Sequence, residues 1–342
     1  MYKTQDNNFN LIRFALATLV IYSHSTPLIH GNNDLEYLKS TFGSFTFGTL
    51  AVNLFFAISG YMILKSWMSK PDLKRFCRAR ILRIYPGFFF VTMFSVFFLN
   101  SVGSTFSSNF ERIDKLVLLK CLVLLRDFPA SADFMPNFPV PALNGSLWTI
   151  IYEFKFYMLI ALAGSLDVAK RLKFWMAIFL GSILIYSFEL FTFLDESRLF
   201  LFVIGSSKDT SRLLMFFSSG CAFYILRDRI KPSWTSSLGF LPVIFVGMFQ
   251  TKIDEIVLAS LGVYCLFWLG YKEISFLKRF QKLPDISYGV YLYGWPCQKL
   301  ILHFYPITNS NDLFIQSFCL TLCFAYLSWR LIESKFLKLK SI

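Results

Sequence analysis

Ten apolar stretches, each close to the length that crosses a lipid bilayer, constrain the fold of this chain most. A transmembrane helix needs about 20 apolar residues, within a range of about 17 to 25. Of the 342 residues only 16% are charged, whereas a soluble domain carries about 25%. The sequence therefore predicts an all-α, polytopic transmembrane bundle that forms a single domain over residues 1–342. The stretches are 10–29, 45–66, 84–103, 147–166, 172–193, 211–227, 236–250, 254–271, 286–304 and 312–333.

The predicted number of ten spans has a margin of one or two, because the seventh stretch is short and Pro242 interrupts it. With the N-terminus inside the cell, the inner connections hold about twice as many Lys and Arg residues as the outer ones, as the positive-inside rule requires. Both termini are thus predicted to be cytoplasmic. The net charge of +13 then reports orientation and contact with anionic membrane lipids, with no nucleic acid implied.

The seven cysteines are scattered through apolar segments. None forms a Cys-x-x-Cys pair or a cluster with histidine, so we predict buried thiols and no metal site.

Two ionisable residues mark the first apolar stretch, within which the segment RFALATLVIYSH runs from Arg13 to His24. A step of eleven residues is about 16 Å along a helix and returns to nearly the same face. Glu153 lies about 9 Å into the fourth stretch from its outer end, at a depth similar to that of His24. Charged groups inside a membrane usually mark a site, and a histidine beside a carboxylate is suited to act as a general base. The alternatives are a structural His24–Glu153 pair and a pairing of Glu153 with Lys155.

A basic cluster, KPDLKRFCRARILRIYPG, precedes the third stretch and contains Arg78, Arg80 and Arg83. Arg80 and Arg83 are neighbours on a helix face, and guanidinium groups suit phosphate oxygens. We therefore predict a polyanion site at the cytoplasmic face. The alternative is charge that only sets topology and touches lipid headgroups. Pro86 is expected to end or kink this segment.

Further polar residues lie at the ends of apolar stretches or inside them. Ser59 precedes a glycine that permits close approach of two helices, and Lys299 lies at a depth similar to that of His24. Arg330 is expected to pair with Glu333 three residues later. As candidate substrate contacts we add Ser59, Tyr288, Lys299 and Arg330.

One long connection, residues 104–146, is predicted to lie outside the cell and is rich in proline and small residues near its end. Loops of this length are usually lids or disordered links. Both interpretations remain open, the first with a role in binding the acceptor.

Taken together, these segments resemble integral membrane acyltransferase family 3, in its stand-alone transmembrane form. The resemblance runs nearly end to end and depends on the order of several motifs. These are Arg13-x10-His24, Ser59-Gly60-Tyr61, RARILRIYP from Arg78 to Pro86, GSLWTIIYEFKFY from Gly145 to Tyr157, ISYGVYLYGWP from Ile286 to Pro296, and SWRLIE from Ser328 to Glu333.

The resemblance implies transfer of an acyl group, usually acetyl, from cytoplasmic acyl-CoA to a hydroxyl of a cell-surface or lipid-linked carbohydrate. His24 matches the family's catalytic histidine, Arg13 its partner, Arg80 and Arg83 the arginines that meet the CoA phosphates, and Glu153 the acid of the fourth-span motif. It also implies a bacterial inner-membrane protein that acts on lipopolysaccharide O-antigen or exopolysaccharide. Polysaccharide-assembly partners or a homo-oligomer are further possible associations.

Two rival functions use the same residues. A transporter or flippase would use the His, Glu and Arg as a proton relay, but we see no inverted repeat of the kind that transporters often carry. An inactive scaffold for polysaccharide assembly is the third hypothesis, which the presence of His24 disfavours. The chain also departs from the family where many relatives carry a histidine in the ninth span, because Gly294 stands there.

Overall fold

The computed structural model describes residues 8–99, 114–129, 138–197, 200–201, 204–250, 253–272 and 284–339. Every regular element among them is helical. Six helices in the described part of the chain are long and apolar enough to cross a membrane, which supports the predicted all-α membrane protein. The number of ten spans and the side on which the termini lie stay predictions. These six segments are Phe9–His30, Phe47–Ser69, Leu73–Phe97, Leu147–Ser165, Asp254–Tyr271 and Ser310–Lys338.

The helices follow the ten predicted stretches in order. The long elements are α1 (Phe9–His30), α3 (Phe47–Ser69), α4 (Leu73–Met93), α8 (Ile150–Ser165), α9 (Leu172–Ser187), α11 (Ser207–Leu226), α12 (Trp234–Gly247), α14 (Val263–Tyr271), α15 (Ser287–Phe304) and α16 (Ser310–Ser328). The shorter ones are α2 (Tyr37–Phe42), η1 (Phe94–Leu99), α7 (Lys115–Leu124), η2 (Leu147–Thr149), η3 (Thr192–Glu196), α13 (Asp254–Val257), η4 (Leu258–Gly262), η6 (Trp329–Glu333) and α17 (Ser334–Lys338).

Local sequence signals set several helix ends. The side chain of Asp72 accepts a hydrogen bond from the backbone N–H of Arg75 and so begins α4, as an N-cap residue does. Gly31 ends α1 in the left-handed conformation, at φ 80°, which glycine adopts without steric cost. Pro86, which is expected to end or kink its segment, does not end it, because α4 continues through it to Met93; the kink stays a prediction. A single proline removes one backbone donor, and tightly packed membrane helices tolerate such a residue.

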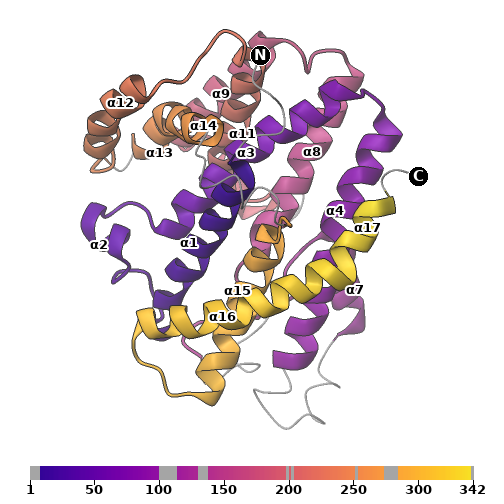
Figure 1. Ribbon diagram of the computed structural model, residues 1–342, viewed down its shortest axis with the longest axis vertical. Coiled ribbons are helices and arrows are strands. Elements are labelled where there is room, and N and C mark those ends of the chain that lie inside the picture. Colours follow the sequence, from indigo (N-terminus) through magenta and orange to yellow (C-terminus); the bar gives the residue numbers. More distant parts are fainter. Residues whose placement is uncertain are drawn as a thin grey trace.

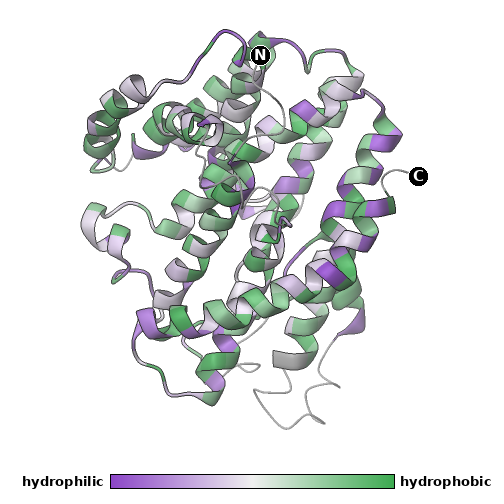
Figure 2. Ribbon diagram, in the orientation of Figure 1, coloured by the Kyte–Doolittle hydropathy of each residue, from purple (hydrophilic) through white to green (hydrophobic). Residues whose placement is uncertain are grey.

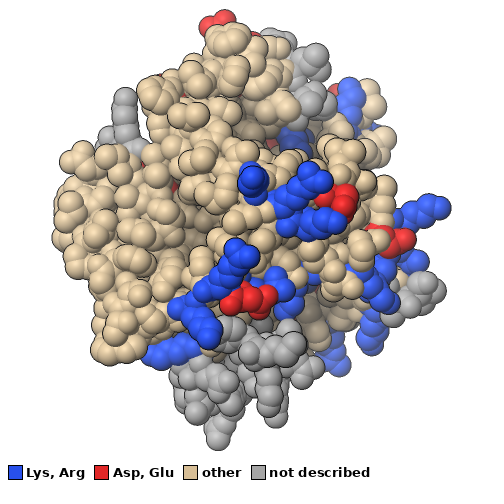
Figure 3. Space-filling view, turned by 90° about the horizontal axis from the view of Figure 1, so that it is seen from above, with Lys and Arg blue, Asp and Glu red and all other residues tan. Residues whose placement is uncertain are grey.

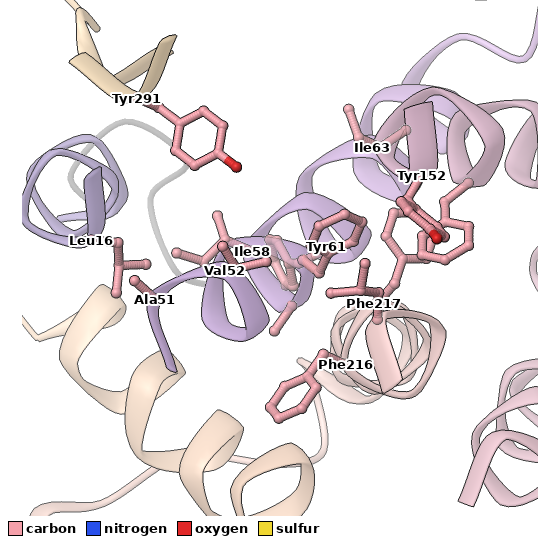
Figure 4. Packing of buried hydrophobic residues seen from close by; sticks show 14 of the residues in the cluster. Leu16, Ala51, Val52, Ile58, Tyr61, Ile63, Tyr152, Phe216, Phe217 and Tyr291 are labelled. Carbon is pink, nitrogen blue, oxygen red and sulfur yellow. The ribbon is translucent and has the colours of Figure 1, made fainter. Parts of the chain in front are cut away.

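Two helices, α3 and α15, organise the bundle (Figure 1). α3 packs between α1 and α11, and α15 packs between α1 and α16. α16, η6 and α17 continue as one long helix that crosses the molecule and ends beside α4. Figure 4 shows the apolar side chains that fill the space where α1, α3 and α11 meet. Hydrophobic residues cover most of the helices, and hydrophilic ones gather along α4 and α17 (Figure 2).

Close helix contact at Gly60 and Gly220 explains how tightly α3 and α11 pack. A Cβ atom on Gly60 would lie 2.0 Å from the carbonyl oxygen of Phe217, and one on Gly220 would lie 1.9 Å from that of Ala57. Only glycine fits at both positions, so the two backbones touch directly. The structure thus shows the close approach that the glycine after Ser59 predicted.

Candidate active site

A cavity of about 340 Å³ opens between α1, α3, α4, α8, α15 and α17. It brings together six of the ten candidate residues from the sequence. Its charged residues are Arg13, Arg80, Arg83, Glu153 and Asp285, and Ser59, Tyr157, Tyr288 and Tyr291 supply hydroxyl groups.

Asp285, directly before α15, joins two of the cavity's arginines. Its carboxylate accepts a hydrogen bond from Arg13 and another, 3.1 Å long, from Arg83. Burial alone would raise the pKa of Asp285, but the two guanidinium groups outweigh it and hold the pKa well below its usual range. Arg83 also lies 3.8 Å from the Glu333 carboxylate. Arg13 and Arg83 are therefore partly neutralised from within the protein.

Arg80 has a different environment. Among the described residues no carboxylate forms an ion pair with it, and its Nε is buried without a hydrogen-bond partner. The guanidinium lies 5.5 Å from the ring centre of Phe76 and 5.6 Å from that of Tyr157. Its Nη2 is 3.5 Å from the hydroxyl of Ser66. Arg80 thus places a fixed positive charge at the wall of the cavity, and its guanidinium can donate further hydrogen bonds.

Tyr157 links Arg80 to two predicted site residues. Its hydroxyl donates a hydrogen bond to Glu153 one turn earlier on α8, and it lies 3.4 Å from the hydroxyl of Ser59 on α3. The pairing of Glu153 with His24 that the depth count suggested is not seen among the described residues. Glu153 instead accepts from Tyr157, because four residues on one helix bring those two side chains together.

His24 lies outside the residues that line the cavity. Its ring and the Trp295 indole form a T-shaped contact, with ring centres 4.9 Å apart and planes at 81°. Nδ1 of His24 is buried and has no hydrogen-bond partner among the described residues. The indole N–H of Trp295 donates to the carbonyl of Ala142, in the segment that leads into α8. His24 is therefore held inside the bundle against an aromatic wall.

Three other candidates also lie outside the cavity. Arg78 is exposed and donates a hydrogen bond to the carbonyl of Leu339, because it lies two positions, or about 200°, around the helix from Arg80.

Arg330 is exposed, while its expected partner Glu333 is 2% exposed and faces Arg83. The π-helical turn η6, which carries both residues, changes their relative phase. Lys299 is buried on α15, 4.8 Å from the ring centre of Phe138.

A second, open groove of about 560 Å³ lies between α1, α2 and the connection from α15 to α16. Tyr22, Thr26 and His30 line it from α1. His24 is two residues from both Tyr22 and Thr26, and therefore lies on the opposite side of that helix. The groove and the His24 ring do not share a face.

Comparison with known proteins decides the family. Residues 6–330 match the model of the acyltransferase domain of acyltransferase family 3. The chain belongs to this acyltransferase family. An O-acetyl transferase of Shigella phage Sf6 is 26% identical over 97% of this chain and 96% of its own length. Nodulation protein 10 of Rhizobium leguminosarum bv. viciae is 24% identical over 98% of this chain and 94% of its own length. No solved structure matches the chain significantly.

The family match and the phage relative support an O-acetyltransferase, so the enzyme class predicted from the motifs is confirmed. In this acyltransferase the ninth-span position where many relatives carry a histidine has a structural explanation. A Cβ on Gly294 would lie 2.7 Å from Cγ1 of Ile21. The glycine lets α15 approach α1 closely and leaves no space there for an imidazole.

Sequence reasoning missed Asp285, Tyr157, Thr149 and Tyr291 as residues that line the cavity. Asp285 carried a usable signal: it is an acid at the inner end of a span, at the depth where Arg13 and Arg83 need partners. The hydroxyl residues carried none, because Tyr and Thr are ordinary in apolar helices. Among the described residues, no group of three His, Cys, Asp or Glu side chains could hold a metal ion.

Proposed function

We propose that this acyltransferase moves an acetyl group from cytoplasmic acetyl-CoA to a hydroxyl of a cell-surface or lipid-linked carbohydrate, in the bacterial inner membrane. O-antigen and exopolysaccharide are the proposed acceptors. The single observation that carries the proposal is the cavity that gathers Arg13, Arg80 and Arg83 from two helices. Guanidinium groups bind phosphate oxygens through charge-assisted hydrogen bonds, and CoA carries both a pyrophosphate and a separate phosphate.

Arg80 makes the cavity suited to this donor. Its buried Nε lacks a partner among the described residues, and a buried donor without a partner costs free energy until a ligand satisfies it. Basic side chains also gather on the face of the molecule that Figure 3 shows, and Lys70, Lys74 and Arg75 lie where α3 leads to α4. This supports a cytoplasmic position for that face and a route by which an anionic donor enters from the cytosol.

His24 is the proposed general base. It would take the proton from the acceptor hydroxyl as the oxygen attacks the thioester carbon, after which the C–S bond breaks and the CoA sulfur receives a proton. General-base catalysis of this kind contributes about 10²- to 10⁴-fold. The chain also carries His30 and His303; His303 is exposed and far along α15, so it offers a matched control.

Glu153 is proposed to support the reaction from the cavity wall, where it holds Tyr157. Ser59, Tyr288 and Arg13 are the proposed further contacts of the donor. The family match favours a transferase over the transporter that remained an alternative.

The test uses the purified full chain in detergent with radiolabelled acetyl-CoA and a panel of bacterial surface glycans. We expect CoA release together with a labelled glycan. His24→Ala should lower the transfer rate at least about 10²-fold, and His303→Ala should leave it unchanged. Transfer that survives in His24→Ala would remove the general base, and a lack of labelled product with every glycan would overturn the acceptor class.

A further inference from the structure

Two hydroxyl groups line the end of the cavity that lies farthest along α15. Thr149 Oγ1 and Tyr291 Oη lie 2.6 Å apart and share a hydrogen bond. Both residues line the cavity, and they are 4% and 8% exposed. The Tyr291 ring projects away from its helix toward the part of α3 that carries Val52 and Ile58 (Figure 4). Its ring centre lies 6.0 Å from that of Phe55, with the ring planes at 70°.

The chain continues from this hydroxyl pair to His24 along two separate elements. Four residues after Tyr291 on α15 comes Trp295, whose ring contacts His24. Four residues before Thr149 comes Gly145, where a Cβ atom would lie 2.8 Å from the same Trp295 ring. Both elements therefore lead from the cavity wall to the indole that holds His24. The Thr149–Tyr291 pair therefore lies on the side of the cavity from which both elements lead to the proposed general base.

This position matters because a thioester can react with two nucleophiles. When an acceptor hydroxyl attacks, its oxygen bonds to the acyl carbon, the C–S bond breaks, and the sulfur takes up the proton that the base removed. When water attacks, the same bonds form and break, but the products are acetate and free CoA. A base that met the thioester at all times would accelerate both reactions.

We propose that the Thr149–Tyr291 hydrogen bond is a partition that keeps the thioester away from His24 until the acceptor is bound, and so favours transfer over hydrolysis. The proposal rests on the proposed function, since it needs a thioester in the cavity. The pair is suited to the role because the hydroxyls satisfy one another when the partition is closed. Opening it needs only a rotation of the tyrosine ring, with no buried charge to separate.

Two substitutions remove the hydrogen bond and keep the side-chain shape: Tyr291→Phe and Thr149→Val. With purified protein and acetyl-CoA alone, without any glycan, we expect each to raise CoA release about fivefold, the change that the net contribution of one hydrogen bond allows. The double variant should match the single ones, because all three lose the same bond. Adding His24→Ala to Tyr291→Phe should return CoA release to the wild-type level.

Matched controls remove a hydroxyl of the same kind elsewhere. Tyr85→Phe loses a hydrogen bond to the carbonyl of Val123, and Thr321→Val loses one to the carbonyl of Ser317. Neither residue lines the cavity, so both variants should hydrolyse acetyl-CoA as the wild type does. Melting temperatures in detergent check that all variants are folded.

The outcomes separate the two proposals. Unchanged acetyl-CoA hydrolysis in both hydroxyl variants, with glycan transfer intact, overturns the partition and leaves the proposed function standing. Extra hydrolysis that persists without His24 also overturns it, because the opened cavity would then not lead to that base. A wild-type protein that releases no CoA with any glycan overturns the proposed function itself.

Discussion

Arg83 and Asp285 lie 202 residues apart in the sequence, yet their side chains meet at 3.1 Å. The contact fastens α4 to the start of α15, and Arg13 on α1 binds the same carboxylate. Arg13 on α1 and Arg83 on α4 thus share one acid at the start of α15, at the wall of the cavity. Because that acid already partners Arg13 and Arg83, the cation with most capacity for an incoming phosphate is Arg80.

Replacing Arg80 should weaken donor binding more than replacing its neighbour Arg78. We expect Arg80→Gln to raise the KM for acetyl-CoA about tenfold, the loss that corresponds to one hydrogen bond to a charged group. Arg78→Gln should change it less than twofold, since Arg78 is exposed and bound to a backbone carbonyl. Steady-state kinetics of CoA release checks both. Equal effects of the two variants would contradict the assignment of Arg80 to the donor cavity.

Replacing Asp285 should destabilise the fold. Asp285→Asn leaves Arg13 and Arg83 without their shared negative charge, and we expect a loss of about 2 kcal/mol in the free energy of unfolding. Asp167→Asn is the matched control, because Asp167 pairs with Lys170 on an exposed surface where such pairs contribute about 0 to 1 kcal/mol. Chemical denaturation in detergent measures both.

The effect of Asp285 should depend on pH with a defined sign. The pKa of this carboxyl in the folded protein lies below its usual value, which is about 4 in an unfolded chain. Its stabilising contribution is therefore complete above about pH 5 and is lost as the pH falls through the folded-state pKa. The stability difference between the wild type and Asp285→Asn should be constant from pH 7 to pH 5 and shrink below pH 4. A difference that grows on acidification would refute the depressed pKa.

Glu153 and Tyr157 should behave as a unit if Glu153 acts through the contact that the structure shows. We then expect Glu153→Gln and Tyr157→Phe to raise the KM for acetyl-CoA by similar factors, with the double variant no worse than either. The pH profile of kcat should not move. A shifted kcat profile in Glu153→Gln alone would instead support the direct pairing with His24 that the sequence suggested.

Close packing at Gly220 gives a prediction that is independent of catalysis. Gly220→Ala would push a methyl group into the backbone of α3, and overpacking of this kind costs about 1 to 3 kcal/mol. Gly181→Ala on α9 is the matched control, because no atom lies within 4 Å of its added Cβ and alanine is the better helix former. Thermal unfolding in detergent should rank Gly220→Ala below the wild type and Gly181→Ala level with it or above.

Sequence periodicity predicted the helices well because long apolar runs leave few alternatives in a membrane. It also found four of the five charged residues that line the cavity: Arg13, Arg80, Arg83 and Glu153 come from three segments that the fold brings together. It failed where the contacts of a side chain depend on its direction around the helix axis. Arg78 and Arg80 are two residues apart and face different environments. The direction in which the Arg330 side chain points depends on a π-helical turn, which no sequence pattern predicts.

Counting depth along each helix did not predict which side chains His24 contacts. It placed His24 near Glu153 along the membrane normal, but depth says nothing about which helices lie between two side chains. The position of Trp295 beside His24 depends on Gly145 and Ala142, in a connection that sequence alone left as either lid or disordered link. The described end of that connection, from residue 138, packs onto α15.

The direct backbone contact of α3 with α11 at Gly60 and Gly220 limits how this enzyme can move during turnover. Because each glycine lies directly against a carbonyl group of the other helix, α3 and α11 cannot slide past one another without a steric clash. The two helices therefore move as one rigid unit. If the acyl group reaches His24 as proposed, the displacement that admits it then comes from the other side of the cavity, where α15 and η2 meet through the Thr149–Tyr291 hydrogen bond.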